Sequence, residues 1–78
     1  MWHLKTKLGT FWIIESDKEA QKYYLGCEDD KLGEYNSLDK ILDDVCNQET
    51  GFLKWDEQLK VTAPHDIGEW EEGPPENW

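Results

Sequence analysis

The sequence predicts a small α+β domain in which one amphipathic helix packs on one face of an antiparallel meander of three to four strands. Three observations support this fold class: short segments near the N-terminus have the composition of strands, one later segment has apolar residues at helical spacing, and the chain has 78 residues. A chain this short forms one domain, and its core rarely supplies more than about 3 to 5 kcal/mol of net stability. Self-association is therefore a second expected source of stability.

The predicted strands come first in the chain, at residues 2–6, 10–15, 22–28 and 32–35. The first alternates apolar and polar side chains, and the second is rich in β-branched and aromatic residues. Leu8 and Gly9 between them suit a hairpin turn because glycine reaches positive φ. Residues 29–31 are polar and predict another tight turn. Strands joined in this way form a meander.

Residues 37–48 give the clearest signal, because apolar side chains recur there at i, i+3, i+4, i+7 and i+8. These apolar residues are Leu38, Ile41, Leu42, Val45 and Cys46. Asn36 or Ser37 is expected to cap the helix, and Gly51 lies where a helix commonly stops. The apolar residues within 52–55 are expected in an irregular segment or a short strand. A short helical turn is also expected in the C-terminal segment.

The charge balance excludes several classes of partner. The chain has eight Lys, no Arg and 18 acidic residues, for a formal net charge of -10. Such a surface repels phosphates and lacks the guanidinium fork that grips them, so direct nucleic-acid binding and binding to anionic membranes are not expected. The sequence has no transmembrane run and no signal-peptide pattern, which predicts a cytoplasmic protein.

The residues that could carry chemistry form no recognisable catalytic motif. Cys27 and Cys46 lack the spacing of a redox or zinc motif and are expected to be reduced core residues. A disulfide, or a metal site completed by His3 and His65, is the alternative. His3 is expected on the surface of a strand, and His65 in an exposed turn where neighbouring acids favour its protonated form. We therefore expect no enzyme activity, no metal site and no cofactor.

The chain divides near Pro64 into a domain of residues 1–60 and an acidic, proline-containing segment of residues 61–78. All three prolines lie in the second part, which has five acidic residues and no lysine. Missing amide donors and restricted φ oppose regular structure there. We expect this segment to be docked on the domain or partly flexible.

Two surfaces are candidates for contact with a partner. In the C-terminal segment, Asp66 can cap one helical turn that places Ile67 and Trp70 on the same face. These two side chains either complete the core or belong to an acidic, Trp-containing motif that binds a partner. The second surface is an open sheet face or an unpaired sheet edge. At least one of Tyr23 and Tyr24 must point to the open face because successive strand residues face opposite sides. The candidate contact residues are Ile67, Glu69, Trp70, Glu71, Glu72, Trp78, Tyr23 and Tyr24.

Two resemblances accompany these patterns. Residues 3–12, 32–37, 50–56 and 69–73, which include the strings LGTFW, LGxYxS and TGFxxWD, resemble a group of small, acidic bacterial proteins that have no assigned function. This resemblance covers nearly the whole chain and implies no activity. Strands followed by a Leu-Gly-x-aromatic-x-Ser step into a helix also resemble the AP2-type DNA-binding module of plant transcription factors. That module binds DNA through arginines and tryptophans on its sheet. The strands of this chain offer Trp12 but no arginine, so the DNA-binding function does not carry over.

The leading hypothesis is a noncatalytic protein-protein interaction module, an adaptor or regulator that binds a basic protein through the acidic segment and the open sheet face. One alternative is a nucleic-acid mimic that occupies a DNA- or RNA-binding protein. A small hydrolase or metal-dependent enzyme is another, and a structural subunit of an oligomer is a third. The sequence identifies no particular partner.

Overall fold

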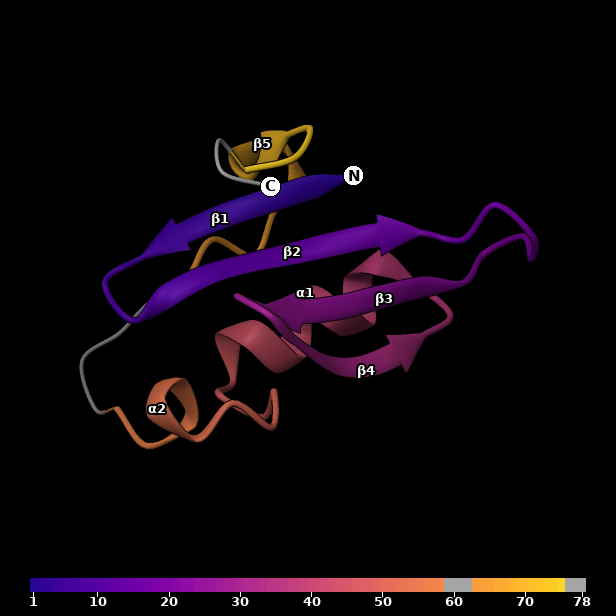
Figure 1. Ribbon diagram of the computed structural model, residues 1–78. Helices are drawn as coiled ribbons and strands as arrows, with labels where there is room; N and C mark the ends of the chain where they lie inside the picture. The colour runs from indigo at the N-terminus through magenta and orange to yellow at the C-terminus, as the bar shows by residue number, and fades with distance from the viewer. Residues whose placement is uncertain (59–62, 76–78) are drawn as a thin grey trace.

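A five-stranded antiparallel sheet forms the centre of the molecule, and its strand order is β4-β3-β2-β1-β5. The computed structural model describes residues 1–58 and 63–75. The strands are β1 (Trp2–Thr6), β2 (Gly9–Glu15), β3 (Tyr23–Cys27), β4 (Asp30–Tyr35) and β5 (Glu71–Glu72). The helices are α1 (Leu38–Cys46), α2 (Leu53–Asp56) and the 3₁₀ turn η1 (Ile67–Glu69). The predicted α+β fold is confirmed, and its sheet includes a fifth strand from the C-terminal segment (Figure 1).

The first hairpin turns one residue earlier than predicted. Thr6 pairs with Gly9, so Lys7 and Leu8 form the two-residue turn. The hydroxyl of Thr6 closes this turn by donating to the Gly9 carbonyl at 2.6 Å. Gly9 has φ 151°, and a Cβ there would come within 3.0 Å of the Cys27 sulfur. Glycine is required at this position by the close approach of β3 as well as by the backbone conformation.

The strand registers divide the sheet into two faces. We call the face that α1 covers the inner face and the opposite one the outer face (Figure 1). Strand alternation places four fully buried side chains on the inner face, Phe11, Ile13, Leu25 and Cys27. Helix α1 adds Ile41, Leu42 and Val45 to the same core, as its apolar spacing predicts. The Ser37 hydroxyl caps α1 by accepting from the Lys40 amide at 3.2 Å.

The segment after α1 is a short helix, and the prediction of an irregular segment or short strand for residues 52–55 was wrong. The Asp56 carboxylate accepts from the Thr50 hydroxyl at 2.8 Å and from the Gly51 amide at 2.8 Å, which ties the start of this segment to the end of α2. Trp55 projects into the core from α2 and donates its indole N–H to the Val45 carbonyl at 2.9 Å. These bonds give structural roles to four residues of the TGFxxWD string, Thr50, Gly51, Trp55 and Asp56.

The C-terminal segment is docked over residues 63–75. Trp70 belongs to the same core cluster as the sheet and α1, and Ile67 and Ala63 pack against that cluster. Beyond Trp70, β5 pairs with the edge of β1 that lies opposite β2, and the Gly73 amide donates to the Met1 carbonyl at 2.7 Å. Residues 59–62 and 76–78, including the predicted contact residue Trp78, lie outside the described part of the chain. No helix in the described ranges is long and apolar enough to cross a membrane.

Candidate interaction surface

Trp12 lies at the centre of the outer face and is stacked on the backbone of β3. Gly26 is its cross-strand partner, and a Cβ at Gly26 would come within 1.9 Å of the Trp12 ring. The Trp12 indole N–H donates to the Glu28 carbonyl at 2.8 Å. Only 8% of Trp12 is exposed, so the ring fills the surface and fixes the position of β3 against β2.

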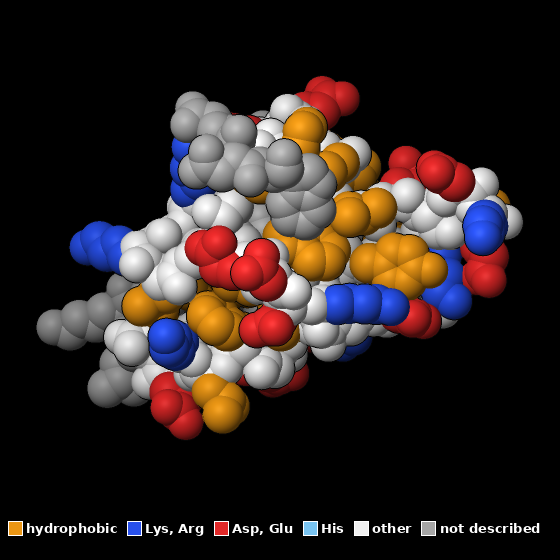
Figure 2. All heavy atoms as spheres, in the orientation of Figure 1, with side chains coloured by type: hydrophobic (Ala, Val, Ile, Leu, Met, Phe, Trp, Pro, Cys, Tyr) orange, Lys and Arg blue, Asp and Glu red, His pale blue; other side chains and the backbone are white. Residues whose placement is uncertain are grey.

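Beside Trp12, the outer face carries half-buried Ile14 and Tyr24, which are cross-strand partners on β2 and β3. The Lys31 ammonium lies 4.4 Å from the centre of the Tyr24 ring, a cation–π distance. It also lies 2.8 Å from the Glu34 carboxylate. In Figure 2, hydrophobic side chains gather over β2 and β3, with charged side chains around them. This face therefore has an apolar centre and a charged border.

The charged border is an ion-pair network around Glu34. Lys22 lies 3.4 Å from Glu34 and 3.2 Å from Glu19. The hydrogen bond that Lys22 donates to Glu19 is the main cause that raises the pKa of Lys22. The hydrogen bond that Lys31 donates to Glu34 is the main cause that lowers the pKa of Glu34. Glu34 is exposed and Lys22 is half-buried at the surface, so the network sets the charge pattern of this border and contributes little to stability.

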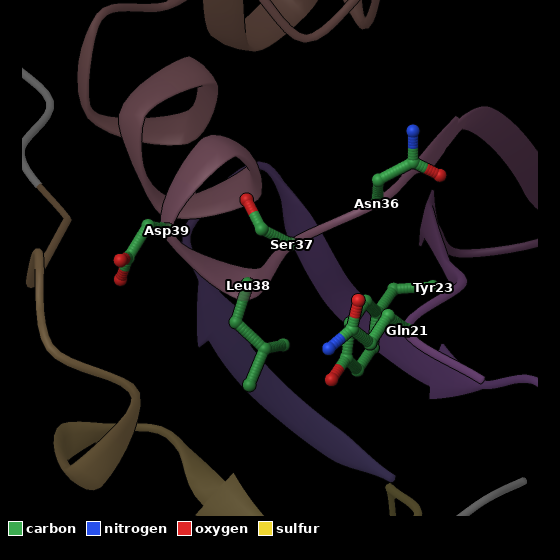
Figure 3. Close-up of a pocket in the computed structure, with 6 residues that line it drawn as sticks. All are labelled: Gln21, Tyr23, Asn36, Ser37, Leu38 and Asp39. Atoms are coloured by element: carbon green, nitrogen blue, oxygen red, sulfur yellow. The ribbon is translucent and has the colours of Figure 1, made fainter.

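Tyr23, the other predicted tyrosine, points to the opposite side. It pairs with Tyr35 on the face of α1 and packs against the core. The prediction that at least one of the two tyrosines points away from the helix is confirmed, and that residue is Tyr24. Tyr23 also lines a concavity of about 320 Å³ at the start of α1. Figure 3 shows Gln21 and Tyr23 on one side of it and the first turn of α1 on the other.

The concavity at the start of α1 has the volume of a small ligand site but not its chemistry. The Ser37 hydroxyl already accepts from the Lys40 amide. The carboxylate of Asp39 lies in the first turn of α1, where it complements the helix dipole and opposes a bound anion. We therefore assign no ligand to it.

The C-terminal segment exposes its acids and buries its ring. Trp70 is only 4% exposed and lies in the core, so its ring is not available to a partner while the segment is docked. Ile67 is half-buried against the same core. Glu69, Glu71 and Glu72 are exposed. Ile67 and Trp70 therefore complete the core, which is the first of the two roles predicted for them.

His3 is buried, and its prediction as a strand surface residue was wrong. It faces outward on β1, but β5 and Gly73 close over it, and only 5% of it is exposed. Its Nδ1 lies 2.8 Å from the Gly73 carbonyl oxygen, and its Nε2 lies 2.8 Å from the Glu71 carboxylate. The burial of His3 depends on the pairing of β1 with β5, and these two strands lie near opposite ends of the sequence. No local sequence pattern could therefore have revealed it.

His65 is exposed, as predicted, and it contacts helix α1. Its Nε2 is hydrogen-bonded to the Asp43 carboxylate, and this bond is the main cause that raises the pKa of His65. The sequence-adjacent Asp66 has a different role, since its side chain caps η1 by accepting from the Gly68 amide at 2.9 Å. The acid that favours the protonated ring therefore comes from α1.

The two cysteines are free, and both have thiols of low reactivity. Burial is the main cause that raises the pKa of Cys27 to about 12. Burial also raises the pKa of Cys46, whose thiol donates to the Ala63 carbonyl at 3.2 Å. Cys27 thus fills the core, and Cys46 joins α1 to the C-terminal segment.

Two of the three α1 carboxylates have partners. Asp43 is bonded to His65, and Asp44 accepts from the Tyr35 hydroxyl at 2.7 Å and lies 3.5 Å from Lys40. Burial is the main cause that raises the pKa of Tyr35. Within residues 1–58 and 63–75, no group of three or more acids, histidines and cysteines is placed to hold a metal ion.

Comparisons with family models, with curated proteins and with solved structures found no match to this chain. The resemblances drawn from the sequence stay predictions.

Proposed function

We propose that this chain is a noncatalytic module that binds a basic protein through the outer face of its sheet. The observation that carries the proposal is the pattern on that face, with Ile14 and Tyr24 partly exposed at the centre and Lys31, Glu34 and Glu71 at the border. An apolar centre within a polar border is the usual anatomy of a protein-protein interface.

The charge of the whole chain selects the sign of the partner. A net charge of -10 attracts basic proteins and repels acidic ones, which raises the association rate with a basic partner at low salt. Glu69, Glu71 and Glu72 add exposed carboxylates at the β5 edge and its approach. These acids steer the partner, and Tyr24 supplies the type of side chain that often dominates binding energy.

The noncatalytic part of the proposal is supported by the state of the reactive groups. Both nitrogens of His3 face acceptors, His65 is bonded to Asp43, and the pKa of each cysteine is raised. A general base or nucleophile needs a reactive atom that can approach substrate. Here these atoms are engaged in holding the fold.

Mimicry of nucleic acid is the weaker alternative. A mimic must present a row of carboxylates in place of phosphates, and α1 is the longest helix among the described residues. Asp43 and Asp44 on α1 are bonded to His65, Tyr35 and Lys40, which interrupts such a row.

The test is quantitative capture of proteins from cell extract on the immobilised chain, with two matched variants. Tyr24→Ala removes an aromatic side chain from the outer face, and Leu53→Ala removes an apolar side chain that is 66% exposed on α2. We expect a basic protein that the wild type and Leu53→Ala retain, that Tyr24→Ala loses, and that salt releases. If the two variants capture the same proteins, or if the protein that Tyr24→Ala loses is acidic, the proposal fails.

A further inference from the structure

The two histidines of the chain both join the C-terminal segment to the rest of the molecule. His3 lies on β1 and contacts Glu71 and Gly73 of the segment, whereas His65 lies on the segment and contacts Asp43 of α1. The described residues of the segment include four acids and no lysine, and they dock on a body that is itself acidic. Each histidine therefore stands where two acidic parts of the chain meet.

We propose that His3 and His65 form a pH-dependent clasp that holds residues 63–75 on the sheet when both rings are protonated and loosens when the rings lose their protons. The clasp concerns the conformation of this segment and does not depend on the proposed function.

The geometry of His3 is satisfied only by the doubly protonated ring. Its two partners, the Gly73 carbonyl and the Glu71 carboxylate, are both hydrogen-bond acceptors, and each lies 2.8 Å from a ring nitrogen. The imidazolium ion donates to both. A neutral imidazole has one N–H and one lone pair, so it leaves one acceptor facing a lone pair. His3 is only 5% exposed, so water reaches its ring nitrogens poorly, whereas the Glu71 carboxylate is 72% exposed and turns to water when the bond is lost.

The charged groups around His3 come from two strands and the chain terminus. Glu71 of β5 contacts the ring, Lys5 lies two residues further on the same side of β1, and Met1 carries the terminal ammonium two residues before His3. The residue opposite on β2 is Trp12, which does not titrate. The contact with Glu71 is the direct one.

The acids of α1 near His65 favour its protonated form. Asp43 bonds to it from α1, Asp39 lies one turn earlier on that helix, and Asp66 is the next residue along the chain. The hydrogen bond that Asp43 accepts from the ring and the charge of Asp39 both raise the pKa of His65. Because the His65 and Asp43 side chains are 54% and 49% exposed, this point of the clasp is the weaker one.

Loosening the clasp acts on β5, which has only two residues. The segment is also held by the bond from the Gly73 amide to the Met1 carbonyl and by the burial of Trp70. Loss of the His3 bonds leaves the Trp70 anchor in place, so the part of the segment beyond Trp70, which is then held only by the short β5 pairing and the Gly73 bond, opens first. Strand β5 covers one edge of β1 at Trp2 and His3. Release of β5 would make this strand edge accessible.

The direct test is nuclear magnetic resonance of the ¹⁵N-labelled full chain between pH 5 and pH 8. Long-range proton-nitrogen spectra report the protonation state of each imidazole ring. Hydrogen-exchange protection of the Gly73 amide, corrected for intrinsic exchange and divided by that of Val45 in α1, reports docking. We expect this ratio to fall by about tenfold from pH 5 to pH 8, in step with loss of the His3 proton.

Matched variants separate the clasp from a general effect of charge. Glu71→Gln and Asp43→Asn replace each carboxylate with an amide that can donate to a neutral ring or accept from a protonated one. The double variant should therefore keep the ratio nearly constant across this pH range. Glu72→Gln removes the same charge from the neighbouring residue, whose β1 partner is Trp2, and should keep the wild-type response.

Three results would overturn the clasp. The first is a wild-type ratio that does not change between pH 5 and pH 8. The second is a His3 ring that is neutral at pH 5 while Gly73 remains protected. The third is a Glu72→Gln variant that loses the pH response as fully as the double variant, because that result would assign the effect to net charge.

Discussion

Helix α1 and the C-terminal segment contribute to the same core but are attached to the sheet by different means. Helix α1 buries Ile41, Leu42 and Val45 and begins with a serine cap. Residues 63–75 bury one large ring, Trp70, and add a two-residue strand and two histidine contacts. The helix is held by apolar contacts along its length, whereas the segment is held by the buried Trp70 ring, the partly buried Ala63 and Ile67, and a set of polar contacts. The two attachments should therefore respond differently to substitution and to pH.

The largest expected effect is that of Trp70→Ala. Truncating a buried aromatic side chain costs about 3 to 5 kcal/mol, which is comparable to the whole net stability expected of so small a domain. We expect the variant to be largely unfolded, or to lose most of its free energy of unfolding in urea followed by circular dichroism. An unchanged urea midpoint would show that Trp70 is not part of the cooperative core. Removing residues 69–78 is accordingly a poor test of partner binding, because it removes this anchor.

The elements that the sequence predicted correctly are those with local signals. Residues 2–6 alternate, and Ser37 precedes five apolar residues at helical spacing, so each element is specified by its own neighbours. Helix α2 has only four residues, and over so short a segment the spacing of apolar residues does not distinguish a helix from a strand. The hairpin turn was misplaced by one residue because Gly9 was assigned to the turn, whereas its role is to admit Cys27 of the next strand.

The features that the sequence did not predict depend on contacts between distant residues. Strand β5 pairs Glu71 with His3, and His3 is buried where the two strands meet. A two-residue strand has no periodicity of its own. The residues of the candidate surface were also predicted only where the signal is local. Strand alternation placed Tyr23 and Tyr24 on opposite faces, whereas the choice between a docked and an exposed Trp70 depended on contacts with distant residues.

The second prediction compares the anchors of the two attachments. Trp55 is 1% exposed and its indole N–H donates to Val45, whereas the Trp70 Nε1 is buried with no hydrogen-bond partner among the described residues. Trp55→Phe leaves the Val45 carbonyl without this donor, while Trp70→Phe removes an unpaired donor. We expect Trp55→Phe to be more destabilising by about 1 to 3 kcal/mol in urea unfolding. Equal losses, or a larger loss for Trp70→Phe, would indicate that the Trp70 indole is paired in solution.

The third prediction compares the two caps. The Ser37 hydroxyl accepts from Lys40 at the start of a nine-residue helix, and Asp66 accepts from Gly68 at the start of an exposed three-residue turn. Ser37→Ala should cost about 1 kcal/mol, and Asp66→Ala about half of that or less. Thermal or urea unfolding of the two variants measures the difference. A larger loss for Asp66→Ala would mean that the segment depends on its own local structure more than on Trp70 and the histidines.

The smallest expected effect is the pH dependence that His65 contributes to stability. Because its pKa is raised in the folded protein, the stabilisation is fully present below the unfolded-state pKa of about 6.5 and is lost as the pH rises through the folded-state pKa. The difference in free energy of unfolding between the wild type and His65→Gln should therefore be larger at pH 5 than at pH 8. The difference between the wild type and Ser37→Ala should be the same at both values, since no group in that bond titrates in this range. If the His65 difference instead grows with pH, its bond to Asp43 does not hold the segment, and the contrast between an apolar attachment and a titratable one would rest on His3 alone.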